Sequence, residues 1–255
     1  MLESAVPSVR VRAARLVYGA QVLFDDLQFT LPAGAWTCLL GPSGVGKTSL
    51  LRLIAGLESR HGERAATCGD GQPLDGRAAY MAQQDLLLPW LNVLDNVRLG
   101  HVLRGDGHLP EVRDRAYHLL EQVGLARCAD DLPATLSGGM RQRVALARTL
   151  MEDRPVVLMD EPFSALDAFT RVRLQELFAA LLLQRTVLLV THDPLEALRL
   201  GHRIHVMAGR PARVDAPLEP ETPPLRNLHD PELLSLQADL LDRLSKAANG
   251  DGGVD

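Results

Sequence analysis

Residues 41–48 constrain the fold of this 255-residue chain more than any other segment. They read Gly-Pro-Ser-Gly-Val-Gly-Lys-Thr, which matches the pattern of a phosphate-binding loop. A short apolar run at 36–40 precedes them, and apolar residues at helical spacing follow, so the region predicts a strand, a loop and a helix. Glycine permits backbone angles that let several N–H groups converge on an anion. A chance glycine-rich turn would not explain the flanking strand and helix, so the segment predicts nucleotide binding.

Two side chains at the end of this loop are suited to a nucleotide. Lys47 is long enough to reach the β and γ phosphates, and the hydroxyl of Thr48 can bind Mg²⁺. A nucleotide with Mg²⁺ is therefore expected at this loop. The residues expected to contact the nucleotide here are Gly41, Pro42, Ser43, Gly44, Val45, Gly46, Lys47, Thr48 and Ser49.

Residues 156–161, Val-Val-Leu-Met-Asp-Glu, form an apolar run that ends in two acids. Such a run predicts a buried strand that carries Asp160 to its carboxyl end, where α/β sheets bind ligands. Asp160 is then placed to bind Mg²⁺, directly or through water. Glu161 is placed to polarise the attacking water as a general base. Two acids can also open a surface turn, but a phosphate loop in the same chain favours the catalytic interpretation.

Residues 136–142, Leu-Ser-Gly-Gly-Met-Arg-Gln, predict the start of another helix. Ser137 is a good N-cap, and apolar residues continue one face of the helix after it. Alone, the segment could be a capped helix and nothing more. Its hydroxyl and unsatisfied N–H groups are nevertheless suited to an anion. One monomer has little use for two phosphate-binding surfaces on one nucleotide, so the arrangement indicates a dimer that shares its ATP.

At these three segments the chain resembles the ATP-binding subunit of ABC transporters, and the resemblance covers residues 18–207. It implies that the helix start at 137–142 contacts the γ-phosphate of ATP bound to the partner subunit, in a homodimer. It also implies that Tyr18 stacks on adenine and that Asp167 lies in a loop crossing the dimer interface. The residues implied to contact the partner's nucleotide are Ser137, Gly138, Gly139 and Gln142.

The resemblance identifies two further residues near the γ-phosphate. His192 is implied to bond this phosphate and to help orient the catalytic water. Gln83 is implied to touch Mg²⁺ or water and to relay the ATP state to the membrane partner. Gln84 is chemically equal, and the family's usual aromatic residue before the glutamine is replaced by Ala82. The expected catalytic residues are thus Lys47, Glu161 and His192, and the expected Mg²⁺ ligands are Thr48, Gln83 and Asp160.

The composition is typical of soluble globular proteins and restricts the classes of partner that the chain can bind. The formal net charge of -5 argues against nucleic acid, because nucleic-acid-binding proteins usually carry a basic face. No stretch approaches the ~18 apolar residues of a spanning helix, and the N-terminus shows no export signal. The 3 widely spaced cysteines are typical of reduced cytosolic thiols. We expect a protein bound peripherally, through a permease, at the cytoplasmic face of the inner membrane.

The alternation of patterns predicts an α/β fold. We expect a P-loop NTPase core of the RecA-like type, with an N-terminal antiparallel β subdomain and an inserted α-helical subdomain. The ATP-binding domain is assigned to residues 1–225, and residues 226–255 predict a short C-terminal helix at 231–244 and a disordered tail. Within the domain, the core takes 1–84 and 151–225, and the helical insertion takes 85–150.

The local patterns give the expected elements of the core. Residues 58–76 are rich in Gly, Asp and Arg and predict an exposed loop or hairpin. Breaks in the helical insertion are expected near 105–107 and 130–133. Strands are expected at 9–16, 27–31, 36–40, 156–159 and 187–191, and core helices at 47–57 and 170–183.

The combined motifs predict the ATP-hydrolysing subunit of an ABC importer. Binding of ATP closes the dimer, and hydrolysis opens it, so that the cycle drives a membrane permease. A periplasmic or lipoprotein solute-binding protein is the expected indirect partner. The apolar residues 86–91 are then either core of the helical insertion or a surface for the permease.

The segments 83–91 and 136–143 are similar to the importer branch that serves nitrate, sulfonates, taurine and the hydroxymethylpyrimidine precursor of thiamine. Residues 83–90 favour the pyrimidine precursor. The cargo itself does not touch this subunit, so no residue here encodes it directly.

Three alternatives compete with an importer. An exporter subunit shares the same motifs. A soluble ABC ATPase of DNA repair or translation usually has long coiled-coil insertions or two cassettes, and this chain has one cassette and a short insertion. A module that senses nucleotide without hydrolysis is expected to lose Glu161 or His192, and both are present.

Overall fold

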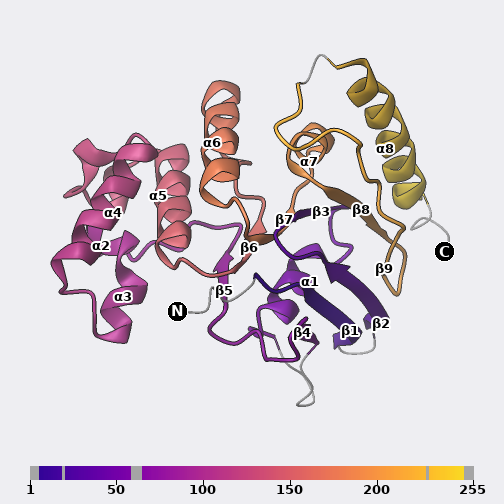
Figure 1. The fold of residues 1–255 in the computed structure, drawn as a ribbon, viewed down its shortest axis with the longest axis horizontal. Helices are drawn as coiled ribbons and strands as arrows, with labels where there is room; N and C mark the ends of the chain where they lie inside the picture. Colours follow the sequence, from indigo (N-terminus) through magenta and orange to yellow (C-terminus); the bar gives the residue numbers. More distant parts are fainter. Residues whose placement is uncertain (1–5, 19–20, 59–64, 228–229, 250–255) are drawn as a thin grey trace. The chain divides into compact units, whose positions relative to one another are not determined.

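The computed structural model describes residues 6–18, 21–58, 65–227 and 230–249. The chain divides into two compact units, each of which is assembled from separate stretches of sequence (Figure 1). The first unit comprises Met1–Ala78, Pro155–Asp160 and Leu182–Asp255, and the second comprises Ala79–Arg154 and Glu161–Leu181.

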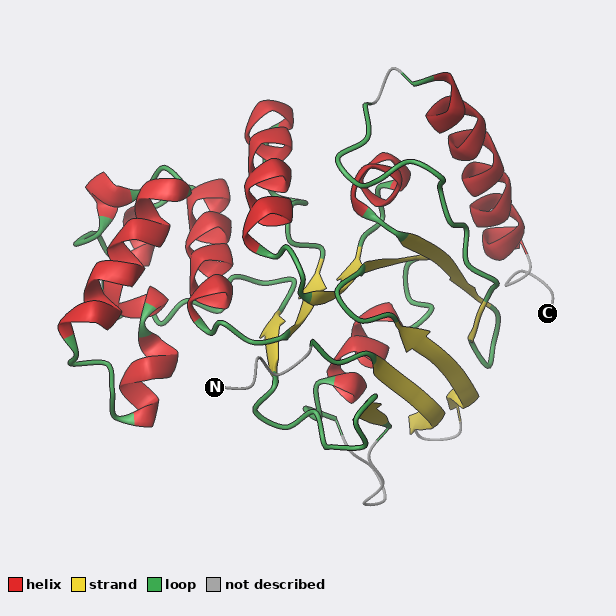
Figure 2. Cartoon of the chain, viewed as in Figure 1, coloured by secondary structure: helices red, strands yellow, loops and turns green. Residues whose placement is uncertain are grey.

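The first unit contains a mainly parallel sheet with the strand order β6-β7-β3-β8-β9 (Figure 2). Its strands β6, β7 and β3 are buried at every position, as expected of a sheet covered on both faces. The predicted strands at 36–40, 156–159 and 187–191 are confirmed, whereas β8 and β9 were not predicted. The bounds are β6 Val156–Asp160, β7 Thr186–Val190, β3 Trp36–Leu40, β8 Arg203–Ala208 and β9 Arg213–Val214.

The register of this sheet brings three strand ends to one edge. Val190 on β7 pairs with Asp160 on β6 and with Leu39 on β3, and all three strands are parallel. The segments that follow β3, β6 and β7 therefore leave the sheet at the same carboxyl edge, which is where ligands bind in open α/β sheets.

A second, antiparallel sheet of the first unit has the order β2-β1-β4. It confirms the predicted N-terminal antiparallel β subdomain. Strand β4 lies within the stretch 58–76, for which a loop or hairpin was expected, and residues 59–64 lie outside the described part of the chain. The bounds are β1 Val9–Tyr18, β2 Gln21–Leu31 and β4 Ala66–Cys68.

Three helices complete the first unit: α1 (Lys47–Ile54), α7 (Pro194–Leu200) and α8 (Pro231–Asn249). Helix α8 contacts α7 and β8, and its inner face buries Leu233, Leu240 and Ala247. It extends beyond the predicted range of 231–244. The predicted disordered tail, from residue 250 onward, lies outside the described residues.

The second unit is mainly helical, and the predicted insertion 85–150 lies within it. The expected breaks fall between helices, because residues 105–107 separate α3 from α4 and residues 130–133 lie between α4 and α5. The unit also takes in α6. The bounds are β5 Ala78–Met81, which leads into the unit, and then α2 Val93–Val97, α3 Leu99–Arg104, α4 Pro110–Gln122, α5 Gly138–Met151 and α6 Ala168–Leu181, with short 3₁₀ turns at Ala126–Cys128 and Pro133–Thr135.

Candidate functional site

The loop between β3 and α1 has the backbone of a phosphate cradle. Gly41, Gly44 and Gly46 have φ angles of 152°, 80° and 109°, a region that L side chains rarely adopt. The Nζ atom of Lys47 donates to the carbonyl oxygens of Gly41 at 2.7 Å and Pro42 at 2.9 Å. The ammonium group is thus held against the loop, beside the backbone at which a phosphate is predicted to bind.

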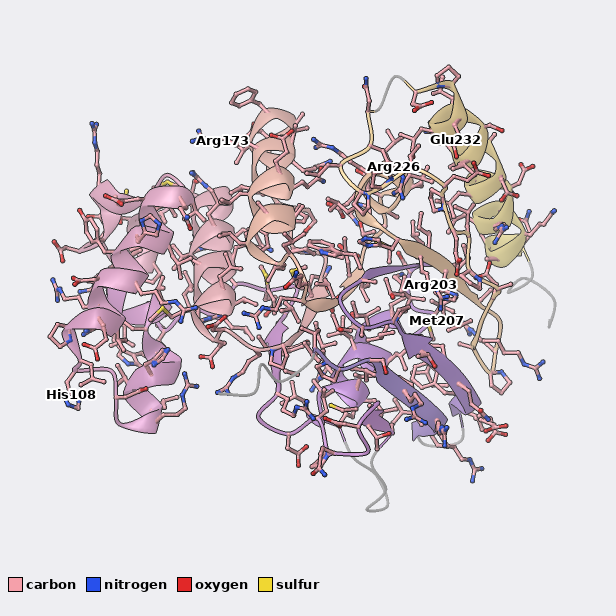
Figure 3. The ribbon with its side chains drawn as sticks, in the orientation of Figure 1. His108, Arg173, Arg203, Met207, Arg226 and Glu232 are labelled. Atoms are coloured by element: carbon pink, nitrogen blue, oxygen red, sulfur yellow. The ribbon has the colours of Figure 1, made fainter. Side chains whose placement is uncertain are left out.

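Two of these glycines are required for packing as well as for backbone angle. A Cβ atom on Gly41 would lie 2.4 Å from the carbonyl oxygen of Met207, which is labelled on β8 in Figure 3. A Cβ atom on Gly46 would lie 2.9 Å from Cε1 of Phe24 and 3.0 Å from the side chain of Leu23. Atoms of β2 and β8 therefore leave no room for a side chain at these two positions of the loop. The sequence pattern alone does not reveal this restriction.

Replacing Gly46 by Ala is expected to weaken ATP binding about 100-fold. The left-handed angle costs about 1–2 kcal/mol, and the contact with Phe24 adds a packing cost of about 1–3 kcal/mol; a sum near 3 kcal/mol corresponds to about 100-fold. Titration of the purified variant with a fluorescent ATP analogue measures the affinity. Gly44→Ala is the matched control, because the φ angle of Gly44 is also positive but a Cβ atom there would meet nothing within 4 Å. Equal affinity losses in the two variants would show that packing against Phe24 does not matter.

Other predicted residues of the first unit lie at the same edge of the sheet as the loop. Asp160 is the last residue of β6 and is only 1% exposed. His192 is exposed and lies two residues after the end of β7. Thr48 is exposed in the first turn of α1, and Ser49 is partly exposed beside it. The parallel register of β6, β7 and β3 thus brings a buried carboxylate and an exposed imidazole to the edge at which the loop begins.

Glu161 follows Asp160 directly and opens the second part of the helical unit. Its φ angle of 48° is left-handed, which is uncommon for a residue with a side chain and recurs at functional sites. Within the same unit, Nε2 of Gln83 donates to Oε2 of Glu161 at 3.3 Å. The hydrogen bond is made by Gln83, and not by the adjacent and chemically equal Gln84.

The helix start predicted at 137 is the start of α5. Ser137 is the N-cap, and its Oγ accepts a hydrogen bond from the backbone N–H of Met140 at 3.2 Å. Ser137 and Gly138 are exposed, and Gly139 is partly exposed. Gln142 is buried, and its Nε2 donates to the carbonyl oxygen of Pro162 at 3.0 Å. The first three residues are therefore open to an external anion, whereas the Gln142 side chain is held inside the unit.

The segment 164–167 leads into α6, and Asp167 caps that helix. Its Oδ1 accepts a hydrogen bond from the backbone N–H of Thr170 at 3.0 Å. Hydrogen bonds from the backbone and then the side chain of Thr170 lower the pKa of the Asp167 carboxyl, which stays charged at neutral pH. Tyr18 is the last residue of β1, and its side chain lies outside the described part of the structure, so stacking on adenine stays a prediction.

Neither a metal cluster nor a membrane span occurs in the described ranges. Across residues 6–18, 21–58, 65–227 and 230–249, no group of three His, Cys, Asp or Glu side chains is arranged to hold a metal ion. In the same ranges, none of the helices combines the length and the apolar character that crossing a membrane requires.

Comparison with known proteins gives matches over most of the chain. A family model described as "ABC transporter" matches residues 24–164. An uncharacterized ABC transporter ATP-binding protein of Haemophilus influenzae is 44% identical over 239 residues, which are 92% of this chain and 98% of the relative. The aliphatic sulfonates import ATP-binding protein SsuB 1 of Rhodococcus jostii is 45% identical over 235 residues, 91% of each chain. SsuB 2 of Burkholderia cenocepacia is 41% identical over 255 residues, 97% of this chain and 92% of the relative.

The fold is similar to that of solved ATP-binding cassettes. Two structures of the cassette MJ0796 match with a TM-score of 0.73 and 28% identity, over 86% of this chain and 100% of theirs. Both are described as dimeric, and one is a post-hydrolysis state bound to ADP and Pi. The predicted fold class, an α/β nucleotide-binding core with an antiparallel β subdomain and added helices, is confirmed.

Proposed function

The chain belongs to the ATP-binding subunits of ABC transporters, and from this premise we propose that it hydrolyses ATP to drive a permease that imports a small solute. The observation that carries the proposal is the shared carboxyl edge of the sheet, because the strands that lead to the phosphate loop, to buried Asp160 and to exposed His192 are parallel and in register. The proposal also includes Glu161 and Gln83, which belong to the second unit.

The chemical roles follow from the side chains. Lys47 would bind the β and γ phosphates of ATP. Thr48, Asp160 and Gln83 would hold Mg²⁺, which would neutralise part of the phosphate charge. Glu161 accepts a proton from the water whose oxygen attacks the γ-phosphorus. The bond between the γ-phosphorus and the bridging oxygen of the β-phosphate then breaks. His192 bonds the γ-phosphate and orients the water. The hydrogen bond from Gln83 to Glu161 supports the assignment, because it joins the amide proposed to bind Mg²⁺ to the carboxylate proposed as the base.

A second copy is proposed to complete each site. The exposed residues at the start of α5, Ser137, Gly138 and Gly139, would bind the γ-phosphate of ATP held by the partner subunit. Asp167, whose side chain caps α6, would support the loop 164–167 at the dimer interface. The buried amide of Gln142 favours a positioning role, because it ties α5 to the segment after Glu161. The dimeric cassettes with the same fold support this arrangement.

For the cargo we propose an aliphatic sulfonate rather than the pyrimidine precursor that residues 83–90 favoured. The support is that relatives named as aliphatic sulfonates import ATP-binding proteins are 41–45% identical over nearly all of the chain. The test is uptake of radiolabelled ethanesulfonate by cells with and without the intact gene. Loss of uptake on deletion, and its return with the wild-type chain but not with Lys47→Ala, is the expected result. Normal uptake after deletion would exclude this cargo, and loss of efflux instead would indicate an exporter.

Trp90 is the residue of the 86–91 stretch best placed to meet the permease. Leu87 is only 9% exposed and belongs to the core, whereas Trp90 is 71% exposed. Trp90→Ala is expected to lower transport about tenfold with ATPase unchanged, as loss of an interface anchor of about 1.4 kcal/mol would do. Uptake and phosphate release measured in the same membrane vesicles give the ratio. Leu57→Ala, at a site that is 58% exposed in the first unit, is the control. A Trp90→Ala protein that transports at the normal rate per ATP would show that Trp90 does not anchor the permease.

A further inference from the structure

Arg226, which is labelled in Figure 3, is a buried arginine of the segment between β9 and α8, and its side chain binds the end of helix α7. We propose that it is a positioning residue for His192, which lies two residues before the start of the same helix. By fixing the last turn of α7, Arg226 would hold the backbone from which the imidazole reaches the γ-phosphate. The inference rests on the proposed function of His192.

The guanidinium group of Arg226 binds two carbonyl groups at the carboxyl end of α7. Its Nη1 donates to the carbonyl oxygens of Leu198 at 2.7 Å and Gly201 at 2.8 Å. Its Nε donates to Oγ1 of Thr222 at 3.1 Å, and its Nη2 donates to the carbonyl oxygen of the same threonine. Arg226 is only 6% exposed, so these bonds compensate for taking its charge out of water. The bonds to Thr222 fix the plane of the guanidinium, and the other two fix α7.

Helix α7 depends on these bonds because of the way it ends. Many helices end at a glycine with a left-handed φ angle, whose backbone N–H helps to bind the last carbonyl groups. Gly201 follows α7, but its φ of -79° and ψ of 132° are extended, so this cap does not form. The carbonyl of Leu198 is bound by Arg226 instead. That of Arg199 accepts from the backbone N–H of Leu225 at 2.7 Å. The segment that carries Arg226 thus replaces the glycine cap.

The backbone beside Arg226 is strained where it makes these bonds. Leu225 has a φ angle of 66°, in the left-handed region, although its side chain is 41% exposed. Strain of this kind persists only where surrounding contacts enforce it. Burial of the Leu225 side chain provides little of that enforcement. The bonds of residues 225–226 to the end of α7 are therefore the contacts that hold this conformation.

The other end of α7 is joined to His192 by local hydrogen bonds. Asp193 is the N-cap, and its Oδ1 accepts from the N–H groups of Leu195 at 2.9 Å and Glu196 at 3.3 Å. The N–H of Asp193 donates to Oγ1 of Thr191 at 3.1 Å, and Thr191 is buried directly after β7. The backbone of His192 lies between these two residues. Its orientation therefore depends on both β7 and the first turn of α7.

The shortness of α7 couples its two ends. It has 7 residues, and a helix of that length is stable only where its surroundings fix it. Helix α7 contacts β3 and α8 in the same unit, and Arg226 fixes its last turn. Loss of the Arg226 bonds is expected to loosen the first turn as well, and with it the direction of the His192 imidazole.

Arg226→Gln is expected to lower kcat for ATP about tenfold, since a catalytic group misplaced by about 1 Å can cost up to roughly 10²-fold. The KM for ATP is expected to stay unchanged, because the phosphate loop and Lys47 are intact. Phosphate release by the purified full-length chain gives both constants. Arg203→Gln is the matched control, because it removes a 2.7 Å contact with Glu219 that joins β8 to the same C-terminal segment. It is expected to keep the wild-type kcat. Equal losses in the two variants would show a general loosening of that segment and overturn the inference.

A double-mutant cycle with His192 separates positioning from a general loss of structure. In single-turnover hydrolysis, His192→Ala is expected to be slow. Adding Arg226→Gln is expected to slow it no further, because the side chain to be positioned is already gone. Independent losses that multiply in the double variant would overturn the inference. If Arg226→Gln is not folded by circular dichroism, Arg226→Lys replaces it, since lysine keeps the charge but lacks the planar fork of arginine.

The same measurements distinguish failure of the inference from failure of the proposed function. A His192→Ala chain that hydrolyses ATP at the wild-type rate would contradict the proposed role of His192, and the inference with it. A slow His192→Ala chain beside an Arg226→Gln chain of normal kcat would overturn the inference alone.

Discussion

Replacing Glu161 by Gln is expected to lower ATP turnover by roughly 10²–10⁴-fold, the usual contribution of a general base. The amide keeps the shape of the side chain but cannot accept the proton of the attacking water. ATP binding is expected to persist, because Lys47 and the loop glycines are unchanged. Bound ATP that is not cleaved should hold the dimer closed. Phosphate release measures turnover, and light scattering with ATP and Mg²⁺ measures the mass of the trapped species.

The control for this variant is Glu121→Gln, at an exposed position on α4. It makes the same chemical change away from the proposed base and is expected to hydrolyse ATP normally. Normal turnover in the Glu161→Gln chain would contradict the base assignment. If the Glu161→Gln chain is inactive but stays monomeric with ATP, the assignment of Glu161 as the base stands. The same result would contradict a dimer that shares its ATP sites.

Replacing Ser137 by Arg is expected to reduce hydrolysis by roughly 100-fold or more, since the loss of one donor to a transition-state anion costs about 10²–10³-fold. The bulky cation removes the hydroxyl that caps α5 and fills the exposed position proposed to meet the partner subunit's ATP. The affinity of the isolated monomer for ATP should hardly change, because Ser137 is proposed to contact the ATP of the partner subunit and not that of its own subunit. Equilibrium dialysis at low protein concentration measures this affinity.

Ser235→Arg provides the comparison, because Ser235 is an exposed serine near the start of another helix, α8. It is expected to keep full activity. A large loss of monomer affinity in the Ser137→Arg chain would show that Ser137 acts on the ATP of its own subunit. Mixing the inactive Ser137→Arg and Lys47→Ala chains should restore part of the activity, because a mixed dimer has one intact composite site.

Elements with a strong local pattern were predicted well. The strands β3, β6 and β7 are continuous apolar runs, and their predicted and observed bounds agree within a residue. Strands β4 and β9 have only 3 and 2 residues, so they have no measurable period and exist through pairing with distant segments. Strand β8 was missed although it is 6 residues long, because its polar Arg203 and His205 interrupt the apolar run.

The side-chain contacts at the candidate site could be predicted less well from the sequence. The contact of Gln142 with nucleotide stays a prediction, and the sequence did not indicate that its amide is buried against the carbonyl of Pro162. Asp85 and Arg148 were not singled out, since an arginine on a charged helix is more often solvated. A detectable signal exists for the contacts of Asp85 with α5: Arg141 and Arg148, which donate to Asp85, are seven residues apart, so they lie on one face of that helix.

The proposed chemistry could be predicted from single segments, because a phosphate loop, an acidic pair after a strand and a serine-capped helix start each consist of neighbouring residues whose spacing sets their local geometry. The surroundings of these segments were revealed by the folded chain. The carbonyl of Met207 and the ring of Phe24 make glycine obligatory at 41 and 46, and the register with Val190 brings Asp160 to the edge at which the loop begins. These features depend on contacts between residues far apart in the chain, and side-chain periodicity within one segment carries no record of which distant segment will pack against it.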